Sequence, residues 1–193
     1  ARGHGVRLAV KSKSMATEEV HLNRALEQAG VEVVETDLGE FILQLAQDTP
    51  SHLVMPVMHK SRQEIAELFS RLAGRAVSTR TEELTAVARE YLREKFLAAE
   101  MGISGANFLV AETGTLVLVT NEGNGDLTQT LPRVHIVLAT IEKLVPTLED
   151  AVQLIFGRTF EGWTGPGRAY YELNQEYAHL TGIHWRPEKR AYC

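Results

Sequence analysis

The chain has 193 residues, with 20 lysines and arginines against 25 aspartates and glutamates, so its formal net charge is −5. Hydrophobic residues make up 44% and charged residues 23% of the sequence, which excludes wholesale disorder and lets the chain fold without a disulfide or metal. The acidic balance disfavours nucleic acid as a partner. No apolar run approaches the roughly 18–20 residues that a membrane span needs, and the first ten residues lack the features of a signal peptide.

The cysteine content decides which cofactors and which compartment we expect. The single cysteine, Cys193, is the last residue, so no disulfide can form within the chain. One cysteine also cannot build a cysteine-ligated zinc or iron–sulfur site. We therefore expect a cytoplasmic protein with no cofactor held by this chain. Because the sequence starts at Ala1 without Met and enters a strand-like run within five residues, we expect a segment of a longer protein.

The first 35 residues predict a strand, a helix and a strand, the unit from which parallel sheets are built. Apolar residues recur at helical spacing in the middle segment, which Ser14 or Thr17 would cap and Gly30 would end. The three elements are expected over residues 6–10, about 17–29 and 31–35.

The pattern continues through the next 120 residues. Helices are expected over residues 41–45, from Ser61 to Gly74, over 82–101 and over 147–156. Strands are expected over 52–57, 108–111, 115–120 and 134–138, with a hairpin turn between the second and third of these. The expected fold class is therefore α/β, a mostly parallel sheet flanked by helices, over residues 1–156. Residues 157–193 show no clear period and form an irregular, aromatic-rich tail.

A polar loop of two lysines and two serines follows the first predicted strand. Parallel α/β sheets bind ligands at the carboxyl ends of their strands, and hydroxyls, lysines and helix N–H groups suit a carboxylate or phosphate. The same residues also fit a solvated turn with a serine cap. The loop consists of Lys11, Ser12, Lys13 and Ser14.

Two further loops carry candidate site residues. Glu112, Thr113 and Gly114 separate two apolar strands; Glu112 fits a catalytic base or nucleophile if burial raises its pKa, and the three residues equally fit a plain hairpin turn. A glycine-rich loop could present backbone N–H groups to an anion, or be an ordinary connection, because it matches neither nucleotide-binding fingerprint and no helix is expected directly after it. That loop consists of Asn121, Glu122, Gly123, Asn124 and Gly125.

The histidines give little support for a metal site. His52 and His59 flank a predicted strand, and no pair has the spacing of a chelating motif. Arg133 and His135 would share one strand face, where either could orient a ligand or be structural. No metal is expected.

Several long strings resemble the LUD domain of the lactate utilisation proteins, and most closely that of the B component. They occur in the same order and at natural spacing, and cover about residues 5–155. The strings are VKSKSMATEEVHLNRALEQAGVEVVETDLGEFILQLA, PSHLVMPVMHKSRQEIAELF, AREYLREKFLAAEMGISGANFLVAETGTLVLVTNEGNG and LPRVHIVLATIEKLVPTLEDA.

The resemblance implies a fold like that of the NagB, RpiA and CoA transferase group, and a part in the oxidation of L-lactate to pyruvate. It implies a cytoplasmic three-component system, with A- and C-type components as partners and a small carboxylate or other anion as ligand. In that family the B component carries [4Fe-4S] clusters after the LUD domain. This chain lacks the cysteine-rich region, lacks sequence that precedes the first strand in the family, and departs from the family after about residue 157.

The resemblance also groups the three loops into one candidate site. Lys11 and Lys13 would meet an anionic ligand, Glu112 would be the acid/base or a structural carboxylate, and Gly123 and Gly125 would form a lid or cradle. Second-rank candidates lie just past predicted strands or in the matching strings; they are Glu18, Glu35, Asp37, His59 and Arg133.

Three hypotheses of function follow. The first is a LUD domain of an iron–sulfur protein of lactate oxidation, inactive as an isolated chain because the redox cofactors lie elsewhere. The second is a free-standing enzyme of isomerase or CoA-transferase type that acts on a small anionic metabolite through Glu112. The third is an assembly module that docks through aromatic anchors of the tail. Those anchors are Trp163, Tyr170, Tyr171, Tyr177 and Trp185.

Overall fold

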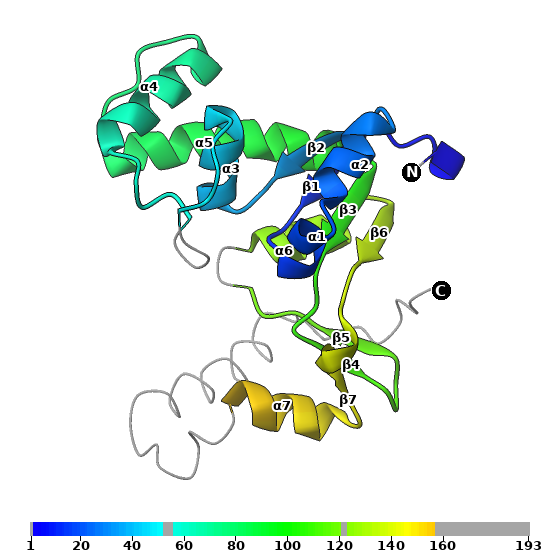
Figure 1. The fold of residues 1–193 in the computed structure, drawn as a ribbon. Coiled ribbons are helices and arrows are strands. Elements are labelled where there is room, and N and C mark those ends of the chain that lie inside the picture. Colours follow the sequence, from blue (N-terminus) through cyan, green and yellow to red (C-terminus); the bar gives the residue numbers. More distant parts are fainter. Residues whose placement is uncertain (1, 52–55, 121–122, 157–193) are drawn as a thin grey trace, which may run out of the picture. The chain divides into compact units, whose positions relative to one another are not determined.

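Four short strands form a parallel sheet, sheet A, in the computed structural model of the protein (Figure 1). Their order across the sheet is β2-β1-β3-β6, and every neighbouring pair is parallel. The strands are β1 (Leu8–Lys11), β2 (Glu32–Glu35), β3 (Met101–Ser104) and β6 (Val134–Val137). The predicted α/β class with a mostly parallel sheet is confirmed; the likeness to the NagB, RpiA and CoA transferase group stays a prediction.

The structure describes residues 2–51, 56–120 and 123–156, and the chain divides into two units. The first unit comprises residues 1–105 and 119–139 and contains sheet A. The second comprises residues 106–118 and 140–193. The predicted tail over 157–193 and its five aromatic anchors lie outside the described residues, as do residues 52–55 of the predicted strand over 52–57; Pro56 and Val57 are in a turn.

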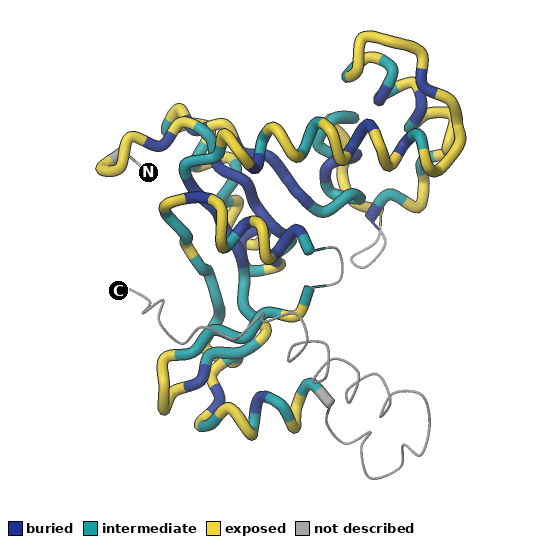
Figure 2. The backbone as a smooth tube through the Cα atoms, turned by 180° about the vertical axis from the view of Figure 1, so that it is seen from behind, coloured by how far each residue is buried: buried dark blue, intermediate teal, exposed yellow. Residues whose placement is uncertain are grey.

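Helices of the first unit lie on both faces of sheet A. The helices are α1 (Met15–Glu19), α2 (Leu22–Gln28), α3 (Leu38–Ala46), α4 (Arg62–Ala73), α5 (Thr81–Ala98) and α6 (Asn124–Thr130), preceded by a 3-10 turn at Arg2–His4. Leu22 and Leu26 of α2 pack on buried strand residues that include Ala9 and Ile103. Buried residues run along β1, β2 and β3 (Figure 2).

The opposite face of the sheet meets α6, and the contact depends on a glycine. A Cβ atom on Gly102 would lie 1.8 Å from the Thr128 carbonyl oxygen. Thr128 itself is fully buried. Only a residue without a side chain therefore lets α6 approach β3 this closely.

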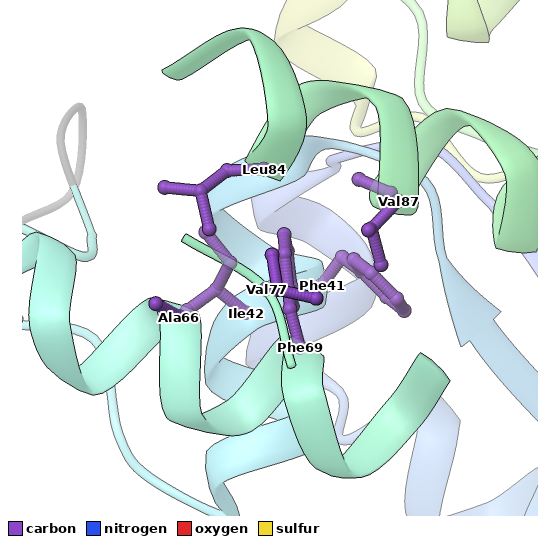
Figure 3. Packing of buried hydrophobic residues seen from close by; sticks show 8 residues of the cluster. Phe41, Ile42, Ala66, Phe69, Val77, Leu84 and Val87 are labelled. Carbon is purple, nitrogen blue, oxygen red and sulfur yellow. The ribbon is translucent and has the colours of Figure 1, made fainter. Parts of the chain in front are cut away.

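Helices α3, α4 and α5 share a second core, shown in Figure 3. Phe41 and Phe69 are each 1% exposed, and their ring centroids lie 6.1 Å apart. Tyr91 stacks on Phe41 at a centroid distance of 5.4 Å. Three helices that are consecutive in the chain thus pack their apolar side chains against one another.

The edge of sheet A at β2 is closed by the side chain of Gln44, on α3. Its Nε2 donates to the Val33 carbonyl at 2.7 Å, and its Oε1 accepts from the Glu35 N–H at 3.0 Å. The amide therefore bonds β2 as a further strand would, which protects this edge from pairing with another chain.

Within residues 106–118 and 140–156, the second unit has a three-stranded sheet and one helix. The strands are β4 (Phe108–Val110), β5 (Thr115–Val117) and β7 (Leu144–Val145), in the order β5-β4-β7, with a 3-10 turn at Ile141–Lys143 and the helix α7 (Leu148–Phe156). β4 and β5 form the predicted antiparallel hairpin, and β7 is parallel to β4. The predicted helix over 147–156 is confirmed.

Several predicted boundaries are wrong. The helix expected over 17–29 is two helices, because His21 adopts a left-handed conformation (φ 51°) between them. The helix expected over 82–101 ends at Ala98, and Met101 begins a strand whose buried side chains belong to sheet A. The helix expected over 41–45 begins earlier, at Leu38, since Asp37 is its N-cap.

A more consequential correction concerns the glycine-rich loop. A helix begins inside it: α6 includes Asn124 and Gly125 of the predicted loop, with Gly123 as N-cap in a left-handed conformation (φ 73°). Its polar sequence shows no apolar stripe, and contact with β3 holds it in place.

Candidate functional site

The carboxyl edge of sheet A is the candidate site, because it gathers ionisable side chains from separate parts of the sequence. Lys11 ends β1 and Glu35 ends β2, and the two residues are register partners in the parallel pair. The loop after β1 leads into α1 and the loop after β2 leads into α3. Sequence reasoning placed the lysine–serine loop at this kind of edge, and that is where the structure has it.

Lys11 and Glu35 form a buried ion pair. The Lys11 Nζ lies 2.9 Å from Glu35 Oε1 and 3.0 Å from Oε2, with the two side chains 1% and 9% exposed. Asn23 of α2 donates its Nδ2 to Glu35 Oε1 at 2.6 Å. Burial raises the pKa of the Glu35 carboxyl above its ordinary value, and the Lys11 ammonium opposes that shift. The pair is thus the charged centre of the edge.

Asp37 lies two residues beyond Glu35 and receives hydrogen bonds from two loops. The Lys13 backbone N–H donates to Asp37 Oδ2 at 2.6 Å. Burial raises the pKa of the half-buried Asp37 carboxyl, and hydrogen bonds from the Lys13 backbone and the Asn124 side chain oppose the shift. A carboxyl whose affinity for a proton is raised in this way suits general acid or base chemistry.

Both lysines of the loop are already paired. Lys13 Nζ lies 2.5 Å from Glu40 Oε1, as Lys11 Nζ lies within 3.0 Å of Glu35. An anion that approaches either ammonium would therefore compete with a carboxylate of the protein. The role of the lysines in binding an anion stays a prediction. The two ammonium groups and the two carboxylates that hold them carry no net charge together, so they do not add support for it.

Residues of three loops meet through hydrogen bonds at this edge. Thr36 Oγ1 donates to the Lys11 carbonyl at 3.0 Å, and Asn124 Nδ2 donates to Thr36 Oγ1 at 3.1 Å. Ser14 caps α1, where its Oγ accepts from the Thr17 N–H at 3.4 Å. The structure therefore brings together the predicted lysine–serine loop, the predicted Glu35 and Asp37, and Asn124 of the glycine-rich loop, with Gly123 and Gly125 next to it in sequence.

The predicted Glu112, Thr113 and Gly114 lie in the second unit, at the turn of the β4–β5 hairpin. All three are exposed. The Glu112 N–H donates to the Pro146 carbonyl at 3.1 Å. The burial on which the acid/base hypothesis for Glu112 depends is absent. Asn121 and Glu122 lie outside the described residues.

The remaining second-rank candidates are dispersed. Glu18 on α1 is half-buried, and its charge contributes to the raised pKa of Glu35. His59 is exposed, with its Nε2 3.0 Å from Asp48 Oδ2. Arg133 directly precedes β6, so it lies at the amino edge of the sheet, opposite the candidate site.

Several residues at the edge were missed by sequence reasoning: Asn23, Thr36, Glu40 and Ser104. His135, for which a ligand-orienting or structural role was open, lies with its Nε2 2.8 Å from Ser104 Oγ. Thr36 stands between two predicted candidates, and Glu40 falls one helical turn after Asp37, so position alone could have indicated both. Ser104 was missed because the predicted helix ended at Met101 and no strand was predicted over 101–104.

The family resemblance implies iron–sulfur clusters in longer relatives, and the residues of this chain do not fit them. A [4Fe-4S] cluster takes four cysteine thiolates, whereas the sequence has one cysteine. Across residues 2–51, 56–120 and 123–156, no group of three or more His, Cys, Asp or Glu side chains could hold a metal ion. No step of a mechanism is therefore assigned to such a cluster on this chain. Among the helices of that same part, none combines the length and the apolar character that a membrane crossing requires.

The described part of the chain is thus a parallel α/β domain with ionisable side chains gathered at the carboxyl edge of its sheet, the edge at which open α/β sheets in general bind their ligands. Comparison with known proteins gives the family. The model of the LUD domain matches residues 3–163, so the chain belongs to the LUD domain family.

Curated relatives extend this result. Lactate utilization protein B of Oceanobacillus iheyensis is 53% identical over 146 residues, which cover 76% of this chain and 30% of that protein. The Bacillus cytotoxicus protein of the same name is 48% identical over 155 residues, covering 80% of this chain and 33% of the relative. The Bacillus pumilus protein of that name is 50% identical over 147 residues, covering 76% and 31%. The chain thus spans about a third of the length of these relatives. No solved structure matches it.

Proposed function

We propose that this chain is the LUD domain of a protein of L-lactate utilisation, which takes part in the oxidation of L-lactate to pyruvate within a multi-component, cytoplasmic system. The observation that carries the proposal is the identity of about 50% to proteins named lactate utilization protein B. A- and C-type lactate utilisation components are the proposed partners. The redox cofactors would lie outside these 193 residues, which supply one cysteine.

The chemistry explains why a second component is needed. Converting the CH(OH) group of lactate to the C=O group of pyruvate releases two electrons and two protons. Asp37 at the carboxyl edge of sheet A could take up a proton, because burial raises the pKa of its carboxyl, whereas the Glu35 carboxylate is paired with Lys11. Neither carboxylate accepts electrons. The electrons would therefore pass to an acceptor carried by another part of the system, such as the [4Fe-4S] clusters that the family resemblance implies.

The proposal is tested by exchanging domains in a relative. Residues 3–163 of this chain replace the matching segment of the Oceanobacillus iheyensis protein, and the chimera is expressed in a strain that lacks its own copy. We expect growth on L-lactate as sole carbon source, as with the intact relative, and none when the segment is deleted. A chimera that accumulates to the normal level and does not support growth would refute the proposed role.

A second experiment tests the division of labour. The purified chain is mixed with L-lactate and a redox dye, and dye reduction is followed. We expect none above the protein-free control, because the redox cofactors that would pass electrons from lactate to the dye are proposed to lie outside these 193 residues. Turnover by the chain alone would overturn this part of the proposal and favour a free-standing enzyme.

A further inference from the structure

Three hydroxyl side chains line up across three neighbouring strands at the carboxyl edge of sheet A. The Ser12 N–H donates to the Ile103 carbonyl at 3.0 Å and the Thr36 N–H donates to the Lys11 carbonyl at 2.9 Å, so the ladder runs one residue past the end of β1 and β2. Extending the register by one residue places Ser12 between Thr36 and Ser104. Because side chains alternate along a strand, these three share one face of the sheet. We call Thr36, Ser12 and Ser104 the hydroxyl row.

All members of the hydroxyl row are buried, and the outer two have partners. Thr36, Ser12 and Ser104 are 2%, 5% and 1% exposed. Thr36 Oγ1 bonds to the Lys11 carbonyl and Asn124, as described above, and Ser104 Oγ lies 2.8 Å from His135 Nε2. The Ser12 Oγ, at the centre, has no hydrogen-bond partner among the residues that the structure describes. A buried hydroxyl without a partner is unfavourable, so its presence calls for an explanation.

The surroundings of Ser12 indicate what could satisfy it. The row adjoins Asp37 through Asn124, which bonds to both Thr36 and Asp37. Lys11 and Lys13 are each held by a carboxylate, so the cations of the edge are occupied. Among the buried side-chain hydroxyls that the structure describes, Ser12 Oγ is the one with no hydrogen-bond partner, so it offers an uncharged donor at this edge. A ligand recognised there would offer an acceptor oxygen.

We propose that Ser12 is a binding residue, whose Oγ donates a hydrogen bond to a carboxylate or carbonyl oxygen of a small 2-hydroxy or 2-oxo acid at the carboxyl edge of sheet A. The choice of acid rests on the proposed function. The site itself rests on the hydroxyl row, and it lies within the first unit alone.

The test measures binding of L-lactate and pyruvate to the full 193-residue chain by isothermal titration calorimetry, with the melting temperature of each variant. Ser12→Ala removes the hydroxyl in question. The matched control is Ser70→Ala, in which a half-buried hydroxyl with two partners is lost: Ser70 Oγ donates to the Ala66 carbonyl at 2.7 Å and accepts from the Val77 N–H at 3.0 Å. If Ser12→Ala fails to fold, Ser12→Cys replaces it, since a thiol is a weak donor of similar size.

We expect Ser12→Ala to weaken binding of the better ligand about tenfold or more, as loss of a hydrogen bond to a charged acceptor does, with the melting temperature unchanged or raised. Ser70→Ala should lower the melting temperature and leave the dissociation constant unchanged. Two outcomes would overturn the proposal: unchanged affinity in Ser12→Ala, which would mean that the hydroxyl holds only a water molecule, or no binding of either acid by the unaltered chain. The growth experiment on the chimera is independent of both, so the domain's role in lactate utilisation can stand if this site fails.

Discussion

Removing the Lys11 ammonium should destabilise the protein more than most single substitutions. In Lys11→Met a side chain of similar length loses its charge, and the Glu35 carboxylate stays buried without its cation. Side-chain exposures of 1% and 9% and distances of 2.9 and 3.0 Å make this a fully buried pair. Breaking such a pair costs about 3–5 kcal/mol. At about 2–4 °C per kcal/mol for a chain of this size, the melting temperature should fall by about 6–20 °C.

The same substitution should make stability more sensitive to pH. Burial raises the pKa of Glu35 above 4.5 in the folded state, so the folded state holds the proton more tightly than the unfolded state does. The contribution of this carboxyl to stability is therefore fully present below pH 4.5, and it is lost as the pH rises through the pKa that Glu35 has in the folded state. Without Lys11 the loss should be larger, so urea unfolding should show a smaller effect of Lys11→Met at pH 5 than at pH 8.

Glu35→Gln provides the control for this argument. It removes the titrating carboxyl, so Lys11→Met combined with Glu35→Gln should be more stable at pH 8 than Lys11→Met alone. The reasoning would be refuted if Lys11→Met costs less than about 1 kcal/mol, or if its effect is the same at the two pH values. An unchanged cost in the double variant would equally exclude an unpaired Glu35 as the cause.

Other substitutions test the packing. Phe69→Ala should lower the free energy of unfolding by about 3–5 kcal/mol in urea titrations, because it empties the centre of the helical core; a loss under 1 kcal/mol would contradict that packing. Gly102→Ala should cost about 1–3 kcal/mol, since its Cβ would meet the Thr128 carbonyl, whereas Gly3→Ala, with open space around it, should show no shift of the urea midpoint. Gln44→Glu keeps the acceptor for β2 but loses the donor, so we expect a cost of about 1–3 kcal/mol, and equal stability would rule out the edge bonds.

Where local signals were strong, the sequence was sufficient to predict the fold. The helix predicted from Ser61 to Gly74 is α4; the structure adds that Ser61 forms a capping box with Glu64 and that Gly74 is left-handed (φ 65°). The parallel pairing of the first two strands across a helical connection and the β4–β5 hairpin are also confirmed, although that connection holds two helices and not one. In each of these cases the residues that define the element are neighbours in the sequence.

Elements that depend on distant contacts were missed. The strand β3 has four residues, including Gly102, and its place in the sheet comes from pairing with β1 and β6. The polar helix α6 has no apolar stripe to reveal it, and Gly102 lets it approach the sheet closely. Neither feature leaves a periodic signal in the sequence.

The candidate site shows the same limit. Lys11, Lys13, Glu35 and Asp37 were all singled out, because residues after strands of a parallel sheet meet at one edge. Which lysine pairs with which carboxylate depends on strand register and on Glu40, in α3, which the sequence did not indicate. The loop was therefore predicted as a pair of cations open to an anion, whereas the structure has two ion pairs.

The two ion pairs separate the residues of this edge into those that stabilise the fold and those available to bind a ligand. With both ammonium groups held by carboxylates, Coulomb attraction contributes little to the recognition of an acid, and directional hydrogen bonds must supply it. Lys11 and Glu35 then serve the architecture, and their loss should appear in the free energy of unfolding. Ser12 carries a hydroxyl without a partner and Asp37 a carboxyl whose pKa burial raises, so their loss should appear in ligand affinity and its pH dependence instead. A variant of Lys11 that retains its stability but loses ligand binding would show that this separation is wrong.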